Sequence, residues 1–388
     1  MHLPVSPDPL PASGSQKPRY ELLDGLRGVA AMLVIWYHFF EGFATSPTDQ
    51  MMNHGYLAVD FFFVLSGFVI GYAYDDRWRK GLTPRRFMLR RVIRLQPMVV
   101  LAVVLGAVAW IVQGCVRWDG TPMPVGSLLV ALLLGLVLIP VLPGADADVR
   151  GNGEMFPLNG PSWSLFFEYI GSLLYALCLR RLSVRALWTV VIVSGACLAA
   201  TAFGNMSGAY HLGVGWSLAD GGFFGGFFRL SFSFSAGLLI SRTFRRRTIR
   251  GAFWLCAAMM AVLMAMPYIG GDSISPWNAL YDSAATLFTF PLIVWLGACG
   301  TTTDRFSTSV CNFLGELSYP VYIIHYPVMY LFYAWVWDNG YRFADVWPAC
   351  CVLFVVIILM AWAALRYYDA PVRRYLSDRW LSRPERKA

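Results

Sequence analysis

The segment LLDGLRGVAAMLVIWYHFFEGF (residues 22–43) decides the fold, because its apolar part, about 26–44, is long enough to cross a lipid bilayer. A bilayer core of about 30 Å requires about 20 apolar helical residues. Comparable stretches follow at 56–74, 95–113, 125–142, 162–179, 186–203, 222–240, 252–269, 280–299, 313–336 and 347–365. The pattern predicts an all-α, polytopic membrane protein.

The composition excludes an ordinary soluble protein. Hydrophobic residues make up 57% of the chain and charged residues only 14%, whereas soluble domains carry about 25% charged residues. The net charge of +8 comes from short basic runs between apolar stretches, which is typical of cytoplasmic loops rather than of a nucleic-acid-binding surface. The eight cysteines show no CxxC spacing, so we expect small buried residues and no metal site.

The distribution of Lys and Arg indicates the topology. Eleven crossings would place the basic clusters 180–185 and 242–250 outside, against the positive-inside rule. If the proline-flanked stretch 125–142 re-enters instead of crossing, ten crossings remain and both termini are cytoplasmic. Then 26 of the 31 Lys and Arg residues are cytoplasmic. The Gly/Asp/Asn-rich segment 143–161 becomes an outside loop.

The predicted organisation is a single membrane domain with two short cytoplasmic tails. The domain covers 21–376 and the C-terminal tail covers 377–388. The N-terminal tail, 1–20, is rich in Pro and Ser, and we expect it to be disordered and not a cleaved signal peptide.

Ionisable residues inside a bilayer are costly and therefore indicate function. The first crossing carries Asp24, Arg27 and His38. Arg27 and His38 are eleven residues apart, which places them about 20° apart on one helix face and about 16 Å apart along the axis. They could line a path from a cytoplasmic donor to an extracytoplasmic acceptor. The alternative is a snorkelling Arg and an interfacial His.

Further polar residues enter other apolar stretches. Asp60 begins the second apolar stretch and requires an Arg or His partner. His54, which precedes it, is expected to lie in a loop and to have no function. Glu168 stands in the fifth crossing, behind an interfacial Trp163. The basic cluster of Arg90, Arg91 and Arg94 precedes Pro97, which we expect to open a helix. The cluster either sets the topology only or binds phosphates.

Six motifs together resemble the membrane-bound acyltransferase 3 family, whose members O-acylate sugars at the bacterial cytoplasmic membrane. They are LDGLRGVAAMLVIWYH (23–38), VDFFFVLSGF (59–68), RRVIRLQP (90–97), WSLFFE (163–168), LGELSYPVYIIHYP (314–327) and YYDAPVRR (367–374). They occur in the order of the family and extend over nearly the whole chain. Gln96 and Asp369 depart from the usual residues, and neither affects the expected chemistry.

The resemblance implies an O-acyltransferase of the inner membrane. It would move an acyl group, which in this family is usually acetyl, from acyl-CoA to a carbohydrate or glycolipid. Acyl-CoA is then a co-substrate, and no bound cofactor is expected. His38 would act as general base or carry the acyl group covalently, with its ring oriented by Glu168 or Asp60. Arg27 and the cluster of Arg90, Arg91 and Arg94 would hold the CoA phosphates. Further candidate site residues are Asp24, Ser66, Trp163, Ser164, Tyr319 and His325.

Aromatic residues are expected near the outer mouth. Tyr56, Trp163 and Trp216 could stack on sugar rings there, although anchoring at the membrane interface is the default role of such residues.

Two other classes of function stay open. A glycan transporter or flippase could use His38 and Glu168 as a proton relay, although no inverted repeat is apparent. A sensor or an assembly partner would catalyse no reaction. Release of free thiol from acetyl-CoA separates the enzyme from both alternatives.

Overall fold

A computed structural model describes residues 20–244, 249–302 and 304–381 of the chain. The predicted all-α class is confirmed, because the elements in these ranges are helices and no strand occurs among them. The helices are α1 Glu21–Glu41, η1 His54–Leu57, α2 Ala58–Arg79, α3 Pro84–Val112, α4 Val125–Leu136, α5 Ser162–Leu177, η2 Leu179–Arg181, α6 Val184–Phe203, η3 Ala219–Gly221, α7 Gly222–Thr243, α8 Ala252–Ala265, α9 Trp277–Ala284, η4 Ala285–Thr289, α10 Phe290–Cys299, α11 Arg305–Asn339, α12 Phe343–Ala364, η5 Leu365–Asp369 and α13 Ala370–Trp380.

By length and composition, seven helical segments of the described chain could cross a membrane. They are Glu21–Glu41, His54–Arg79, Pro84–Val112, Val184–Phe203, Ala219–Thr243, Trp277–Cys299 and Phe343–Trp380. Helices α4 and α8 are apolar but shorter. The chain is therefore a multi-pass membrane protein.

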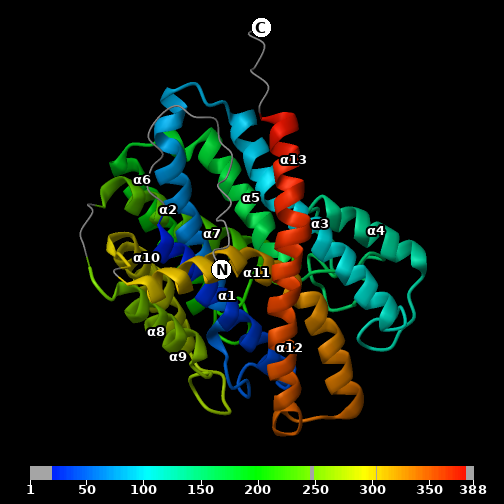
Figure 1. Cartoon of the computed structure of the whole chain (residues 1–388). Coiled ribbons are helices and arrows are strands. Elements are labelled where there is room, and N and C mark those ends of the chain that lie inside the picture. The colour runs from blue at the N-terminus through cyan, green and yellow to red at the C-terminus, as the bar shows by residue number, and fades with distance from the viewer. Residues whose placement is uncertain (1–19, 245–248, 303, 382–388) are drawn as a thin grey trace.

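The centre of the bundle consists of two tightly packed helix pairs. Helix α1 packs along α11, and α2 packs along α7 (Figure 1). Small residues permit the close approach: a Cβ on Gly28 would lie 2.3 Å from the carbonyl oxygen of Leu314, and one on Gly67 would lie 2.0 Å from that of Phe234. The motifs at 23–38 and 314–327 are thereby brought together.

Helix α3 begins earlier than its apolar stretch. Thr83 caps it by accepting a hydrogen bond from the Arg86 amide, and Pro84 takes the first helical position, as both residue types favour. The expectation that Pro97 opens the helix is wrong, because Pro97 lies inside it. The basic cluster 90–94 consequently lies on the helix, and its member Arg91 is buried in the bundle.

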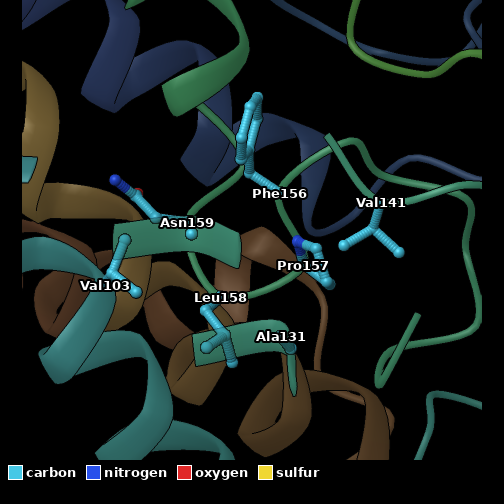
Figure 2. Close-up of a pocket in the computed structure, with 8 residues that line it drawn as sticks. Val103, Ala131, Val141, Phe156, Pro157, Leu158 and Asn159 are labelled. Carbon is cyan, nitrogen blue, oxygen red and sulfur yellow. The ribbon is translucent and has the colours of Figure 1, made fainter. Parts of the chain in front are cut away.

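The predicted outside loop 143–161 is largely buried. After α4 the chain passes between helices, and Val149, Leu158 and Asn159 are fully enclosed. A hollow between α3, α4 and this segment is lined mainly by apolar residues such as Val103 and Ala131 (Figure 2), and it has no room for a water molecule. It is a packing gap and not a binding site.

The last crossing is longer than predicted. Helix α12 continues through the π turn η5 into α13 and ends at Trp380 (Figure 1), so residues 377–380 are helical. The predicted tails at 1–19 and 382–388, and the predicted cytoplasmic arginines at 245–247, lie outside the described residues.

Candidate active site

Five helices, α1, α2, α3, α5 and α11, surround a cavity of about 80 Å³, which is room for several water molecules. Its polar lining gathers candidates that are far apart in the sequence. These are Arg27, Ser66, Arg91, Arg94, Ser164, Glu168, Ser318, Tyr319 and Tyr322. Three guanidinium groups converge here with a single carboxylate.

Arg27 is held in place by α11. Its Nε donates to Ser318 Oγ at 2.7 Å and its Nη2 donates to the Gly315 carbonyl at 3.1 Å. Asp24, one turn earlier, forms an ion pair with the same guanidinium at 3.3 Å. Asp24 therefore helps to position Arg27.

Glu168 is a partner of Arg91. The Arg91 Nη2 donates to Glu168 Oε1, and Ser66 Oγ donates to the same oxygen at 3.1 Å. The Arg91 Nε donates to Ser172 Oγ at 3.2 Å. The expectation that Glu168 orients the His38 ring is wrong, because its carboxylate is engaged at the cavity wall.

The other two arginines of the basic cluster, Arg90 and Arg94, have different surroundings. Arg94 lines the cavity although its side chain is exposed, whereas Arg90 does not line it. At about 100° per residue, Arg94 projects between the other two arginines, about 40° from Arg90 and about 60° from Arg91, so the cavity lies on the Arg91 side of the helix. Tyr319 fixes α11 against α3 by donating to the Leu95 carbonyl at 2.6 Å.

His38 has a carboxylate partner of its own. Its Nδ1 lies 2.7 Å from Glu41 Oε2, and Tyr333 donates to the same oxygen at 2.9 Å. Because an ionised carboxylate only accepts, Nδ1 carries the proton and Nε2 is left as the acceptor. This is the arrangement of a general base whose ring is oriented by a second group. Sequence reasoning missed Glu41, although it stands three residues after His38, a spacing at which helical side chains meet.

A second histidine packs against His38. The His325 ring stacks on it with 5.2 Å between centroids. His325 is fully buried; its Nδ1 bonds to the Val321 carbonyl at 3.2 Å and its Nε2 has no partner among the described residues. Tyr322, which lines the cavity, lies 6.1 Å from the His325 ring. Two rings thus connect the basic cavity to His38.

Asp60 belongs to a different part of the bundle. Arg229 of α7 donates to its two oxygens, at 3.1 Å from Nε and 2.6 Å from Nη2, and both side chains are buried. The prediction that Asp60 needs an Arg or His partner is confirmed, and the expectation that it orients His38 is wrong. Trp163 is only 8% exposed and lies over Arg229 at 5.1 Å, so its ring packs inside the bundle.

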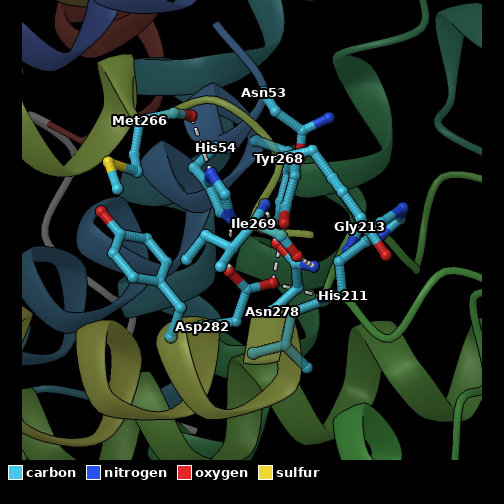
Figure 3. A network of polar contacts seen from close by, with 12 residues as sticks. Asn53, His54, His211, Gly213, Met266, Tyr268, Ile269, Asn278 and Asp282 are labelled. Atoms are coloured by element: carbon cyan, nitrogen blue, oxygen red, sulfur yellow. Dashed lines mark hydrogen bonds and ion pairs between the residues drawn. The ribbon is translucent and has the colours of Figure 1, made fainter. Parts of the chain in front are cut away.

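His54, which is expected from the sequence to lie in a loop and to have no function, is part of a polar network with Asp282 and His211 (Figure 3). Its Nδ1 bonds to the Met266 carbonyl at 2.8 Å and its Nε2 lies 3.5 Å from Asp282. Tyr56 donates to Asp282 at 2.7 Å. Burial, and then the charges of His54 and Arg229, lower the pKa of His211 to about 4, so that ring is neutral. The network joins η1 and α9 to the loop residues Leu212 and Met266.

The buried segment 143–161 supplies a further cluster, which is linked to His38 through the Tyr326 ring between Tyr330 and His38. Glu154 accepts a hydrogen bond from Tyr330 at 2.5 Å. Burial raises the pKa of Glu154, an effect that Tyr330 and Arg150 oppose. The Arg150 guanidinium lies 3.4 Å from the Tyr330 ring centroid and donates to the Pro157 carbonyl at 2.7 Å. Position 154 falls between apolar stretches, so hydropathy gave no reason to select it.

Comparison with known proteins agrees with the motifs. The acyltransferase 3 family model, described as an acyltransferase domain, matches residues 20–366. "Protein 2 in picA locus" of Rhizobium radiobacter is 37% identical over 47% of this chain and 96% of its own length. Exopolysaccharide production protein ExoZ of Rhizobium meliloti is 26% identical over 73% of this chain and 79% of its own length. BcsY of Komagataeibacter xylinus, named as a candidate membrane-bound transacylase, is 25% identical over 80% of this chain and 73% of its own length. No solved structure matches.

Proposed function

This chain belongs to the acyltransferase 3 family, and from that membership we propose that it moves an acyl group, expected to be acetyl, from cytoplasmic acyl-CoA to a hydroxyl of an extracytoplasmic or membrane-associated carbohydrate. The chain itself is a membrane acyltransferase. The observation that carries the proposal is the pairing of a basic cavity with an oriented histidine, connected through Tyr322 and His325. The exopolysaccharide role named for ExoZ favours a carbohydrate acceptor.

The basic cavity suits the phosphates of a CoA thioester. Arg27 and Arg91 are held by hydrogen bonds, so they need little reorganisation to meet an anion. Guanidinium groups bind phosphate oxygens in a bidentate manner. Arg94 is exposed at the cavity wall, where an arriving polyanion would meet it first.

His38 then activates the acceptor. Its Nε2 takes the proton of the acceptor hydroxyl while the oxygen attacks the thioester carbonyl carbon, forming the new C–O bond. The C–S bond breaks, and the leaving thiolate takes the proton from the imidazolium. Glu41 stabilises that imidazolium through Nδ1, as a paired carboxylate does for a catalytic histidine. The alternative role of His38, as a covalent acyl carrier, requires the same orientation.

We also propose ten crossings, with 125–142 re-entrant and both termini cytoplasmic, in the inner membrane. Helix α4 has 12 residues and is therefore about 18 Å long, shorter than a bilayer core of about 30 Å. The chain on either side of it meets again: the Trp118 amide donates to the Arg150 carbonyl at 3.1 Å. Flanks that are joined in this way favour a segment that enters and leaves on one side.

The test is the release of thiol by purified protein in detergent. Acetyl-CoA plus methyl glucoside, methyl galactoside or N-acetylglucosamine should yield free CoA and an O-acetylated sugar, and His38→Ala should yield neither. Release of no thiol by the wild-type protein with any of these acceptors would count against acyl transfer from CoA. In that case, movement of a glycan across vesicles would favour the flippase.

A further inference from the structure

Three neighbouring side chains, His38, His325 and Tyr326, each keep a polar atom without a hydrogen-bond partner among the described residues. His325 Nε2 is buried and unbonded. His38 bonds to Glu41 through Nδ1, and its Nε2 makes no hydrogen bond to the described residues. Tyr326, whose ring contacts the His38 ring at 4.8 Å between centroids, is 9% exposed. Of the three atoms, only His325 Nε2 is fully buried, and buried polar groups nearly always have partners. The His38 side chain is 15% exposed, so the three atoms converge on a partly open site, and we read this as a place for a ligand that supplies the missing bonds.

The other tyrosine hydroxyls on this face of α11 are all engaged. Tyr322 bonds to Ser164 at 2.8 Å. Tyr330 donates to Glu154 and accepts from the Gly160 amide at 3.1 Å. Tyr333 donates to Glu41. The hydroxyl of Tyr326 is the exception.

The surroundings of Tyr326 suit a polyhydroxyl molecule. Glu41 and Glu154 are bonded to the two neighbours of the Tyr326 ring, His38 and Tyr330, and carboxylates accept hydrogen bonds from hydroxyl groups. The backbone at Gly160 comes close to the hydroxyl end of the ring, since a Cβ there would lie 3.1 Å from Tyr326 Cζ and 2.6 Å from Cε1. Glycine at this position leaves the ring in place.

We propose that Tyr326 binds the acceptor, and that the acceptor presents two adjacent hydroxyls, one to His38 and the next to Tyr326. The inference rests on the proposed function and adds a requirement for a vicinal diol. The first hydroxyl loses its proton to His38 Nε2 and takes the acyl group from the thioester. The second stays intact and only exchanges a hydrogen bond with the tyrosine.

Two small alcohols test this without knowledge of the natural acceptor. The probes are trans-1,2-cyclohexanediol and cyclohexanol, each supplied with acetyl-CoA, and the readout is the ratio of the two ester-forming rates. The wild-type protein should prefer the diol about tenfold beyond the statistical factor for its second hydroxyl, which is the worth of one hydrogen bond. Tyr326→Phe should abolish that preference. The KM for acetyl-CoA should stay unchanged.

Controls separate binding from folding. Tyr175→Phe removes a buried, bonded hydroxyl at Asp75, away from His38, and should keep the preference. Gly160→Ala, which presses on the Tyr326 ring, should lose it. Because the readout is a ratio, a smaller folded fraction does not change it. A preference that persists in Tyr326→Phe, or is absent from an active wild-type protein, would overturn the inference while the proposed function stands. A wild-type protein that acylates neither alcohol nor any sugar would remove the proposed function itself.

Discussion

At the scale of single residues, the Glu41 carboxylate selects which nitrogen of His38 faces the substrate. Glu41→Gln should keep the size of the side chain but allow an amide N–H to face Nδ1, which favours the wrong tautomer. We expect kcat to fall about 10- to 100-fold, by analogy with the effect of losing the carboxylate partner of a metal-bound histidine. The KM for acetyl-CoA should not change. Asp338→Asn, an exposed change on α11, is the control. A kcat for Glu41→Gln equal to that of the control would remove Glu41 from the site.

Arg94 tests the donor end of the site. Arg94→Ala should raise the KM for acetyl-CoA, and added salt should weaken the wild-type protein more than the variant because ions screen the interaction. Arg85→Ala removes an exposed arginine from the first turn of the same helix and should leave KM unchanged. Steady-state kinetics on correctly inserted protein distinguish donor binding from a purely topological role of the cluster. An unaltered KM in Arg94→Ala would leave the cluster with a topological role only.

Substitution of Asp60 distinguishes a role in stability from a role in catalysis. Asp60→Asn leaves the buried Arg229 without its counter-charge, and breaking one side of such a pair costs about 3–5 kcal/mol. We expect a marked drop in the unfolding temperature in detergent, with normal turnover per folded molecule. Asp272→Asn changes an exposed aspartate outside the helices and should melt normally. Normal melting combined with lost turnover in Asp60→Asn would restore a catalytic role.

The sequence identified the charged residues that are unusual in apolar stretches, but it did not identify the residues with which they pair. Arg27, Arg91, Arg94 and Glu168 stand out because charge is rare in apolar stretches, and the structure gathers them at one cavity. Their pairing depends on how distant helices align, which no single stretch encodes. Arg229, the partner of Asp60, is 169 residues away.

At the scale of elements, hydropathy located the helices but not all of their ends. It placed the third helix at 95, because the basic residues before it lower the local hydropathy, whereas the helix begins at Pro84. The signal was present in Thr83 and Pro84, a cap and a first-turn proline. The burial of 143–161 had no such signal, since its polar residues are satisfied by distant groups such as Tyr330.

Helix α4 gives the topological prediction. Asp119 and Asp146 are exposed on either side of it, so single cysteines at both positions should react with a membrane-impermeant reagent added from the outside. The exposed Cys178 and Cys351 and the partly exposed Cys115 and Cys197 are first replaced by serine. Labelling of the two positions from opposite sides would mean that 125–142 crosses.

At the scale of the whole molecule, the bundle separates two chemical environments along α1. Arg27 lies at the basic cavity, and His38 lies among tyrosines and carboxylates about 16 Å away by helical rise. This separation suits a polyanionic donor and a polyhydroxyl acceptor that approach from opposite ends. The packing of α1 against α11 holds the two ends in register.

The most direct test of the account is the rate of acetyl transfer by His38→Ala, compared with wild type at equal amounts of inserted protein. General base catalysis contributes about 10²–10⁴-fold, so we expect at least a 100-fold loss, with binding of acetyl-CoA retained because Arg27, Arg91 and Arg94 are untouched. Near-normal transfer by His38→Ala would contradict the account.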